Sequence, residues 1–117
     1  MTANMHELSI TRSVVAIVSE QAVGQRVTRV RLEIGSLSAI LPDAIRFCFD
    51  ICAADTPLAG AELQIVEIPG LGCCNECGAE VPLETLVGRC PRCGTSSLRL
   101  IAGQELNIKE IEVQSCA

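Results

Sequence analysis

The sequence predicts an α+β fold, in which a small, mostly antiparallel sheet is covered by two helices and carries an inserted cysteine-rich subdomain. Three observations support this prediction. Two segments have apolar residues at helical spacing, four shorter segments have the composition of strands, and the stretch Gly70–Ser97 holds five of the eight cysteines. A chain of 117 residues can form one compact core but not two, so we interpret the cysteine-rich stretch as an appendage of a single body.

The first helix is expected from Glu7 to Gly24, with one broad apolar half. That half comprises Leu8, Ile10, Val14, Val15, Ile17, Val18 and Ala22. The second helix is expected to begin at Pro42, whose fixed φ suits the first helical position, and to end by Pro57–Gly60. Its buried face follows the spacing i, i+3, i+4, i+7 and comprises Ile45, Cys48, Phe49 and Cys52. We therefore interpret the two cysteines on this face as core thiols.

Strands are expected at Val30–Ile34, Glu62–Ile68, Leu98–Ile101 and Glu105–Val113. In the first of these, Arg29 and Arg31 alternate with apolar residues, which assigns both arginines to a solvated sheet face. The predicted domains are a helix-and-sheet body of residues 1–69 plus 98–117, and an insert of residues 70–97. The insert has few large apolar residues, so we expect it to have no hydrophobic core of its own.

Composition excludes several classes of protein. Hydrophobic residues make up 49% of the chain, which excludes a disordered protein. Aromatic residues make up only 2% and the net charge is −5, which argues against nucleic-acid binding because stacking platforms and a basic surface are both lacking. No apolar run is long enough to span a bilayer, so no membrane association is expected. No secretory signal opens the sequence, and we expect a reducing cytoplasmic location in which paired cysteines bind metal.

The insert contains two C-x2-C motifs, Cys74–Cys77 and Cys90–Cys93, separated by 12 residues. Each motif bends the backbone so that two thiolates point at one ion, and two such turns form a closed tetrahedral site that suits Zn²⁺. The sequence therefore predicts a zinc ribbon with Cys74, Cys77, Cys90 and Cys93 as ligands. Cys73 is adjacent to the first motif, but the spacing favours Cys74. A disulfide pair, free thiols or a rubredoxin-like iron site are the alternatives, and Cys116 is expected to be a free thiol in the tail.

The residues Met5-His6-Glu7-Leu8-Ser9-Ile10 resemble the opening of the HypA/HybF family, the nickel-insertion accessory proteins of nickel–iron hydrogenase maturation. The resemblance continues through Val30–Gly35, the helix around Pro42, both C-x2-C motifs and the closing segment Gln104–Val113. It covers essentially Met5 to Val113 in the order of the family. A short N-terminal motif and a zinc ribbon occurring together at this spacing make the resemblance specific.

The resemblance implies a nickel metallochaperone and no enzyme. Family members carry Ni²⁺ as cargo at the N-terminus, hold structural Zn²⁺ in the ribbon, and act with the GTPase HypB to supply the hydrogenase large subunit. By position, His6 is the nickel residue, with Glu7 contributing through its backbone, and the body of the chain is the nickel-binding domain. A homo-oligomer is compatible with the sequence. Imidazole and deprotonated amide nitrogens suit square-planar Ni²⁺ on chemical grounds as well.

The family motif begins at the first residue, whereas Met1–Asn4 precede it here. A chain beginning at Met5 would present a free amine to nickel, so we expect removal of these four residues to strengthen nickel binding. Two other functions are considered. The chain could be a zinc-ribbon interaction adaptor that delivers no metal, or a thiol oxidoreductase that uses Cys90 and Cys93. An adaptor would bind zinc alone, and an oxidoreductase would need its cysteine pair at the start of a helix.

Overall fold

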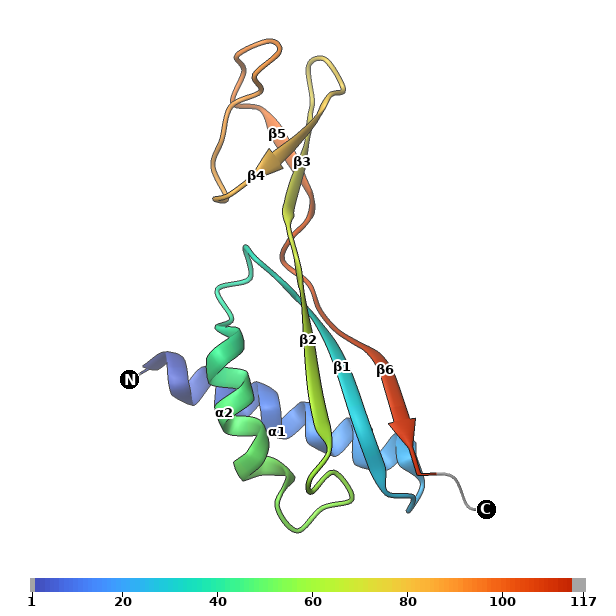
Figure 1. Ribbon diagram of the computed structural model, residues 1–117. Coiled ribbons are helices and arrows are strands. Elements are labelled where there is room, and N and C mark those ends of the chain that lie inside the picture. The colour runs from blue at the N-terminus through green and yellow to red at the C-terminus, as the bar shows by residue number, and fades with distance from the viewer. Residues whose placement is uncertain (1, 115–117) are drawn as a thin grey trace. The chain divides into compact units, whose positions relative to one another are not determined.

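The computed structural model describes the backbone of residues 2–114 and the side chains of residues 6–114. Along the chain the elements are α1 (Thr2–Ala22), β1 (Val27–Gly35), α2 (Pro42–Ala53), β2 (Glu62–Ile68), β3 (Gly70–Cys74), β4 (Glu80–Leu83), β5 (Leu98–Ala102) and β6 (Leu106–Val113) (Figure 1). The strands form two three-stranded sheets, with the orders β2-β1-β6 and β4-β3-β5. The predicted α+β class with two helices and small antiparallel sheets is confirmed over the described residues.

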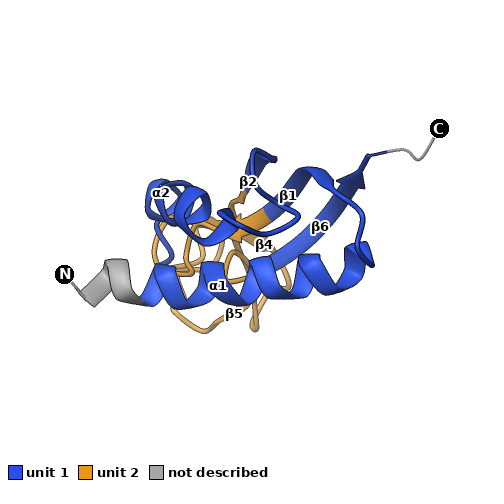
Figure 2. Cartoon of the chain, turned by 90° about the horizontal axis from the view of Figure 1, so that it is seen from below, with its two compact units in different colours: residues 1–32, 40–66, 107–117 blue, residues 33–39, 67–106 orange. Residues whose placement is uncertain are grey.

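The chain divides into two compact units, coloured separately in Figure 2. The first unit contains the residues up to Leu32, Ile40–Val66 and the residues from Asn107 onward, and the second contains Glu33–Ala39 and Glu67–Leu106. This division differs from the predicted insert of residues 70–97, because the second unit also takes in residues 33–39 and 98–106. Residues 98–106 belong to the second unit because β5 pairs with β3 in the second sheet and does not join the sheet of the body.

In the first unit, α1 runs across one face of the sheet (Figure 1). The helix buries Val14, Val15, Val18 and Ala22, as its apolar spacing predicts. The prediction is wrong for Ile17, which is 48% exposed. The prediction also missed two polar residues that are fully buried. Thr11 lies one turn before Val14 and Val15 on the same face of the helix, and Glu7 lies two turns before them. The face that α1 buries is therefore apolar over its later turns and polar near its start.

Helix α2 begins at Pro42, as predicted, and buries Ile45, Cys48 and Phe49. Cys52, the fourth residue of the predicted face, is only half-buried. Leu41 occupies the N-cap position and its side chain provides no cap. The N–H of Leu41 itself bonds a residue of α1, which belongs to the site described below.

The outer face of the first sheet carries the charged residues of β1. Arg29 pairs with Glu112 at 2.7 Å and Arg31 with Glu110 at 3.5 Å, so the partner moves back along β6 as the chain advances along β1. This pattern is that of antiparallel strands. Both pairs are partly exposed, in agreement with the predicted solvated face, and each is expected to contribute little to stability.

The second unit has a small core around two of its cysteines. In its sheet, β3 is antiparallel to both β4 and β5. The buried residues form one cluster: Leu37, Cys74, Val81, Leu83 and Cys90. The expectation of an insert without a hydrophobic core is therefore corrected, although Leu37 comes from outside residues 70–97 and two members of the cluster are cysteines.

Three glycines allow backbone segments of the second unit to approach one another closely. The N–H of Gly35 donates to the carbonyl of Glu105 at 2.7 Å, and the N–H of Leu37 donates to the carbonyl of Gly103, also at 2.7 Å. A Cβ at Gly35 would overlap the Gly103 carbonyl, and one at Gly103 would overlap the Cα of Gly70. Gly103 also has φ +116°, a conformation that side chains disfavour. No side chain larger than hydrogen fits at this crossing.

Gly103→Ala should therefore destabilise the second unit by about 3 kcal/mol, because overlap of backbone atoms adds to the cost of the positive φ. Gly24→Ala is the matched control, since Gly24 also has a positive φ (+80°) but nothing within 4 Å of the added Cβ. The control should cost only about 1 kcal/mol. Amide hydrogen exchange in β3 and β5 should lose protection in Gly103→Ala and keep the parent's protection in Gly24→Ala, because Gly24 lies in the first unit. Equal protection in the two variants would contradict the packing argument.

Candidate functional site

The two C-x2-C motifs of the second unit fold into nearly identical turns. Cys74 ends β3, and its carbonyl accepts the N–H of Gly78 at 3.0 Å. The carbonyl of Cys90 accepts the N–H of Gly94 at 2.8 Å. Both glycines have φ +77°, which closes each turn immediately after its second cysteine. The first cysteine of each motif is buried and the second is exposed.

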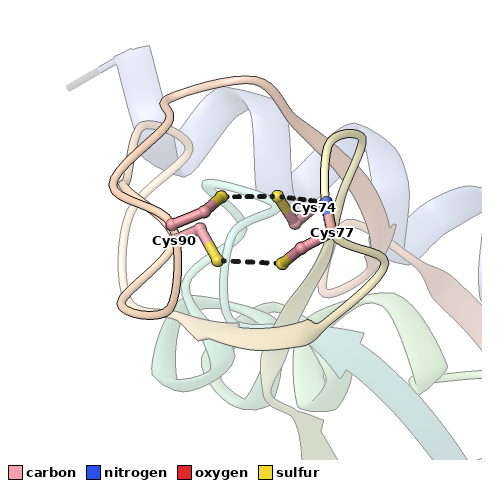
Figure 3. Close-up of side chains that lie close together, drawn as sticks. Cys74, Cys77 and Cys90 are labelled. Atoms are coloured by element: carbon pink, nitrogen blue, oxygen red, sulfur yellow. Dashed lines mark hydrogen bonds between the residues drawn. The ribbon is translucent and has the colours of Figure 1, made fainter.

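The turns bring four sulfur atoms together. Each of the Sγ atoms of Cys74, Cys77, Cys90 and Cys93 lies within 4.8 Å of the other three. The Sγ atoms of Cys74 and Cys93 are 3.4 Å apart, and those of Cys77 and Cys90 are 3.6 Å apart (Figure 3). A zinc–sulfur bond of about 2.3 Å in tetrahedral geometry gives sulfur–sulfur distances of about 3.8 Å. The four thiols therefore fit one Zn²⁺ with small side-chain movements and leave no coordination position for a substrate.

The four thiols fall into two classes, two with lowered pKa values and two with raised ones. The N–H of Cys77 bonds the sulfur of Cys74, and this bond is the main reason that the pKa of Cys74 is lowered to about 6. The N–H of Cys93 lowers the pKa of Cys90 in the same way. At Cys93 itself the N–H of Thr95 lowers the pKa, but the contact with the Cys74 sulfur, burial and the other two sulfurs outweigh it and raise the pKa to about 12. The pKa of Cys77 is also raised. A divalent ion bound by all four sulfurs would therefore displace protons from the two exposed thiols, whose pKa values are raised.

The remaining described cysteines lie apart from this cluster. The Sγ of Cys73 lies 3.8 Å from the carbonyl oxygen of Cys74 and 3.7 Å from that of Gly78, outside the four-sulfur group, in agreement with the spacing argument. Cys48 is a buried thiol in α2, and its pKa is raised by burial first, then by Cys52 and Glu7. The prediction for Cys116 concerns a residue outside the described part of the chain.

His6 is exposed on α1, near the start of the helix. It is the single histidine of the sequence. Because α1 begins at Thr2, α-helical geometry directs the N–H groups of His6 and Glu7 to the carbonyls of Thr2 and Ala3. The imidazole is therefore accessible to a metal ion, while the two amides that the family resemblance assigns to nickel are engaged in the helix.

Glu7 points the other way and is fully buried. Its Oε2 accepts the N–H of Leu41 at 3.1 Å, at the N-terminus of α2, while its backbone carbonyl accepts the hydroxyl of Thr11 at 2.7 Å. A carboxylate is favourable at this position because the start of a helix carries partial positive charge. Its other oxygen, Oε1, is buried and has no hydrogen-bond partner among the described residues. Sequence reasoning missed this role, although Glu7, Thr11, Val14 and Val18 share one helical stripe.

Within the described residues, the structure does not provide the feature that the thiol-oxidoreductase alternative requires, which is a cysteine pair at the start of a helix. Cys93 instead ends a turn, irregular backbone follows from Gly94 to Ser97, and β5 begins at Leu98. A reactive cysteine is activated by the N-terminus of a helix or by a nearby cation. The geometry here is that of a metal-binding ribbon. None of the described helices combines the length and apolar character needed to cross a bilayer.

Comparison with known proteins identifies the family. The model of the HypA family, described as hydrogenase/urease nickel incorporation, metallochaperone, matches residues 5–113. The chain belongs to the HypA family. HypA from Trichormus variabilis, a hydrogenase maturation factor, is 62% identical over 110 residues, covering 94% of this chain and 96% of the relative. HypA from Geobacter metallireducens is 51% identical, covering 94% of this chain and 100% of the relative.

Solved HypA structures share the fold. One solution structure of a HypA protein is 25% identical, with a TM-score of 0.68 over 94% of this chain and 97% of that chain. The nickel metallochaperone HypA from Helicobacter pylori, at 22% identity, has a TM-score of 0.65 over 92% of this chain and 96% of that one. The chain is thus a HypA-type metallochaperone of hydrogenase maturation, with nickel as its cargo and a four-cysteine centre suited to structural zinc. This function is favoured over the zinc-ribbon adaptor.

Replacing one cysteine of the four-sulfur group should release about one zinc per chain, because three thiolates do not close the tetrahedral site. Cys90→Ala should also loosen the small core, of which Cys90 is a buried member. Metal analysis of the purified protein and amide exchange in β3–β5 measure both effects. Cys73→Ala is the matched control, since it removes the neighbouring thiol, and it should retain zinc. Full zinc in Cys90→Ala would contradict the ligand assignment.

Proposed function

We propose that this chain accepts one Ni²⁺ through the exposed His6 near the start of α1 and delivers it for insertion into the hydrogenase large subunit. The observation that carries the proposal is the exposed imidazole of the single histidine, within the N-terminal segment that the HypA family model matches. The imidazole nitrogen and the deprotonated amide nitrogens of His6 and Glu7 are the proposed donors. Nitrogen donors in one plane suit low-spin Ni²⁺.

The helical start of α1 gives this binding mode a structural cost. An amide nitrogen can bind nickel only after it has lost its proton, and in α1 the N–H groups of His6 and Glu7 donate to carbonyls one turn earlier. The proposed nickel site therefore forms by local unwinding of the first turns of α1. Unwinding at a helix end is less costly than in the interior, which suits a carrier that must also release its ion.

Zinc is proposed to be bound by Cys74, Cys77, Cys90 and Cys93 as a structural ion. Four thiolates would supply a closed site with no open position, so the ion stabilises the second unit and performs no chemistry on a substrate. This arrangement separates the roles of the two metals. The proposed nickel donors lie at the end of a helix and can release their ion, whereas the zinc ligands include two members of a buried core.

The proposed partners are a HypB-like GTPase and the hydrogenase large subunit. The sequence offers no glycine-rich phosphate loop, so nucleotide hydrolysis would be supplied by the GTPase and the chain itself would catalyse no reaction. We propose that the chain acts in the cytoplasm. Self-association of the chain is compatible with this function.

His6→Ala should abolish specific nickel binding and leave zinc content and fold unchanged, since the imidazole is exposed and no described core residue depends on it. Nickel titration by calorimetry should give a Kd on the order of 1 μM for the parent chain. Tight nickel binding by His6→Ala would move the nickel site to the cysteines. A parent chain that binds zinc but no nickel would support the adaptor function.

Removal of residues 1–4 should strengthen nickel binding for two reasons. The new chain end provides an amine donor at Met5, and the carbonyls that hold the amides of His6 and Glu7 are absent. The visible absorption of bound nickel should move toward the square-planar pattern. Identical affinities and spectra for the two chains would show that neither the amine nor the helical amides govern nickel binding.

A further inference from the structure

The carboxylate of Glu7 joins the two helices of the first unit at a single point. It is fully buried, and its Oε2 accepts the N–H of Leu41, the N-cap residue of α2, at 3.1 Å. Leu41 itself provides no side-chain cap. Glu7 therefore supplies from α1 the acceptor for the N-cap N–H that, in a capping box, a Glu or Gln in the first turn of α2 itself would supply. A charged acceptor at this position is favoured further by the partial positive charge of the helix N-terminus.

Only one oxygen of the buried Glu7 carboxylate receives a hydrogen bond from the described residues to offset its loss of hydration. Oε1 is buried and, within the described part of the chain, has no hydrogen-bond partner. A buried oxygen without a partner has lost its hydration and gained nothing in return. Exposure of the carboxylate would restore that hydration while breaking the bond to Leu41. The closed arrangement is therefore one that the chain can leave at modest cost, as a reversible contact requires.

The position of Glu7 in the chain couples this contact to the nickel donors. His6, which supplies the imidazole, and Glu7 are adjacent residues, and the backbone amides of both are held in α1. Resting on the function proposed above, we propose that Glu7 is a positioning residue: its buried carboxylate holds the start of α1 in helical form and opposes nickel coordination by the His6 and Glu7 amides. Nickel binding then breaks the Glu7–Leu41 contact and alters the N-terminus of α2.

The direction in which nickel affinity changes when the Glu7 charge is removed distinguishes this positioning role from direct binding or charge attraction of nickel by the carboxylate. If the Glu7 carboxylate bound nickel or attracted it by charge, removal of the charge would weaken nickel binding. If the carboxylate holds the helix closed, the same removal strengthens nickel binding, because less free energy opposes unwinding. Thr11 reinforces the closed form, since its hydroxyl holds the carbonyl of Glu7 at 2.7 Å.

The test compares Glu7→Gln with Glu20→Gln. Both variants remove one negative charge from α1, but Glu20 is exposed, whereas the Glu7 carboxylate is the acceptor of the Leu41 N–H. Relative to the parent chain, Glu7→Gln should bind nickel roughly tenfold more tightly, the loss expected when a charge-assisted hydrogen bond becomes a neutral one. Glu20→Gln should bind as the parent does or slightly more weakly. A Glu7→Gln affinity equal to or below that of Glu20→Gln would overturn the proposal.

A measurement on the parent chain tests the coupling without any substitution. Saturation with nickel should shift the amide proton of Leu41 upfield and speed its exchange with solvent, although Leu41 is not a nickel donor. An unchanged Leu41 amide at full nickel occupancy would overturn the proposal while leaving the His6 site intact. If His6→Ala binds nickel as the parent does, the His6 site itself fails, and the two failures are thereby distinguished.

Discussion

The second unit depends on the convergence of four sulfur atoms, all within 4.8 Å of one another. Its core is too small to be stable by apolar burial alone, since the buried cluster of the described residues holds three large apolar side chains (Leu37, Val81 and Leu83) beside Cys74 and Cys90, with Leu98 and Leu100 only partly buried against it. A metal ion bound by those cysteines would link both turns and the core in one step. In small domains of this kind the free energy of metal binding is free energy of folding. The glycine crossing at Gly35, Gly70 and Gly103 then fixes how closely the backbone segments approach.

The core of the first unit differs from that of the second, because α1 buries polar side chains as well as apolar ones. The later turns of α1 pack through Val14, Val15 and Val18, and burial of such side chains is the main favourable term in folding. Near its start the same face is made of Glu7 and Thr11. An apolar residue at position 7 would bury as much surface but would leave the N–H of Leu41 without an acceptor. The polar start of α1 is thus a structural requirement of α2 and lies next to the proposed nickel donors.

The two metals make opposite demands on the chain. A structural ion should be held by ligands that are part of a folded core, and both C-x2-C motifs are closed by backbone hydrogen bonds to Gly78 and Gly94. A cargo ion must be released, so its donors belong where the backbone can change conformation without unfolding the rest. The exposed His6 near the start of α1 meets that demand. A contact that resists the open form, such as the one between Glu7 and Leu41, would favour release to a partner.

The sequence by itself determined the α+β class, the bounds of β2, the start of α2 at Pro42, the four cysteines that converge and the HypA family, because each depends on local spacing or on motifs within short segments. Only the tertiary structure decided that β5 pairs with β3, that Leu37 completes the core of the second unit, and that Glu7 is buried against Leu41. Each of these joins residues distant in the chain. Hydrophobic periodicity cannot identify a buried carboxylate, because its burial is stabilised by a hydrogen bond from the N–H of a residue 34 positions away in the chain.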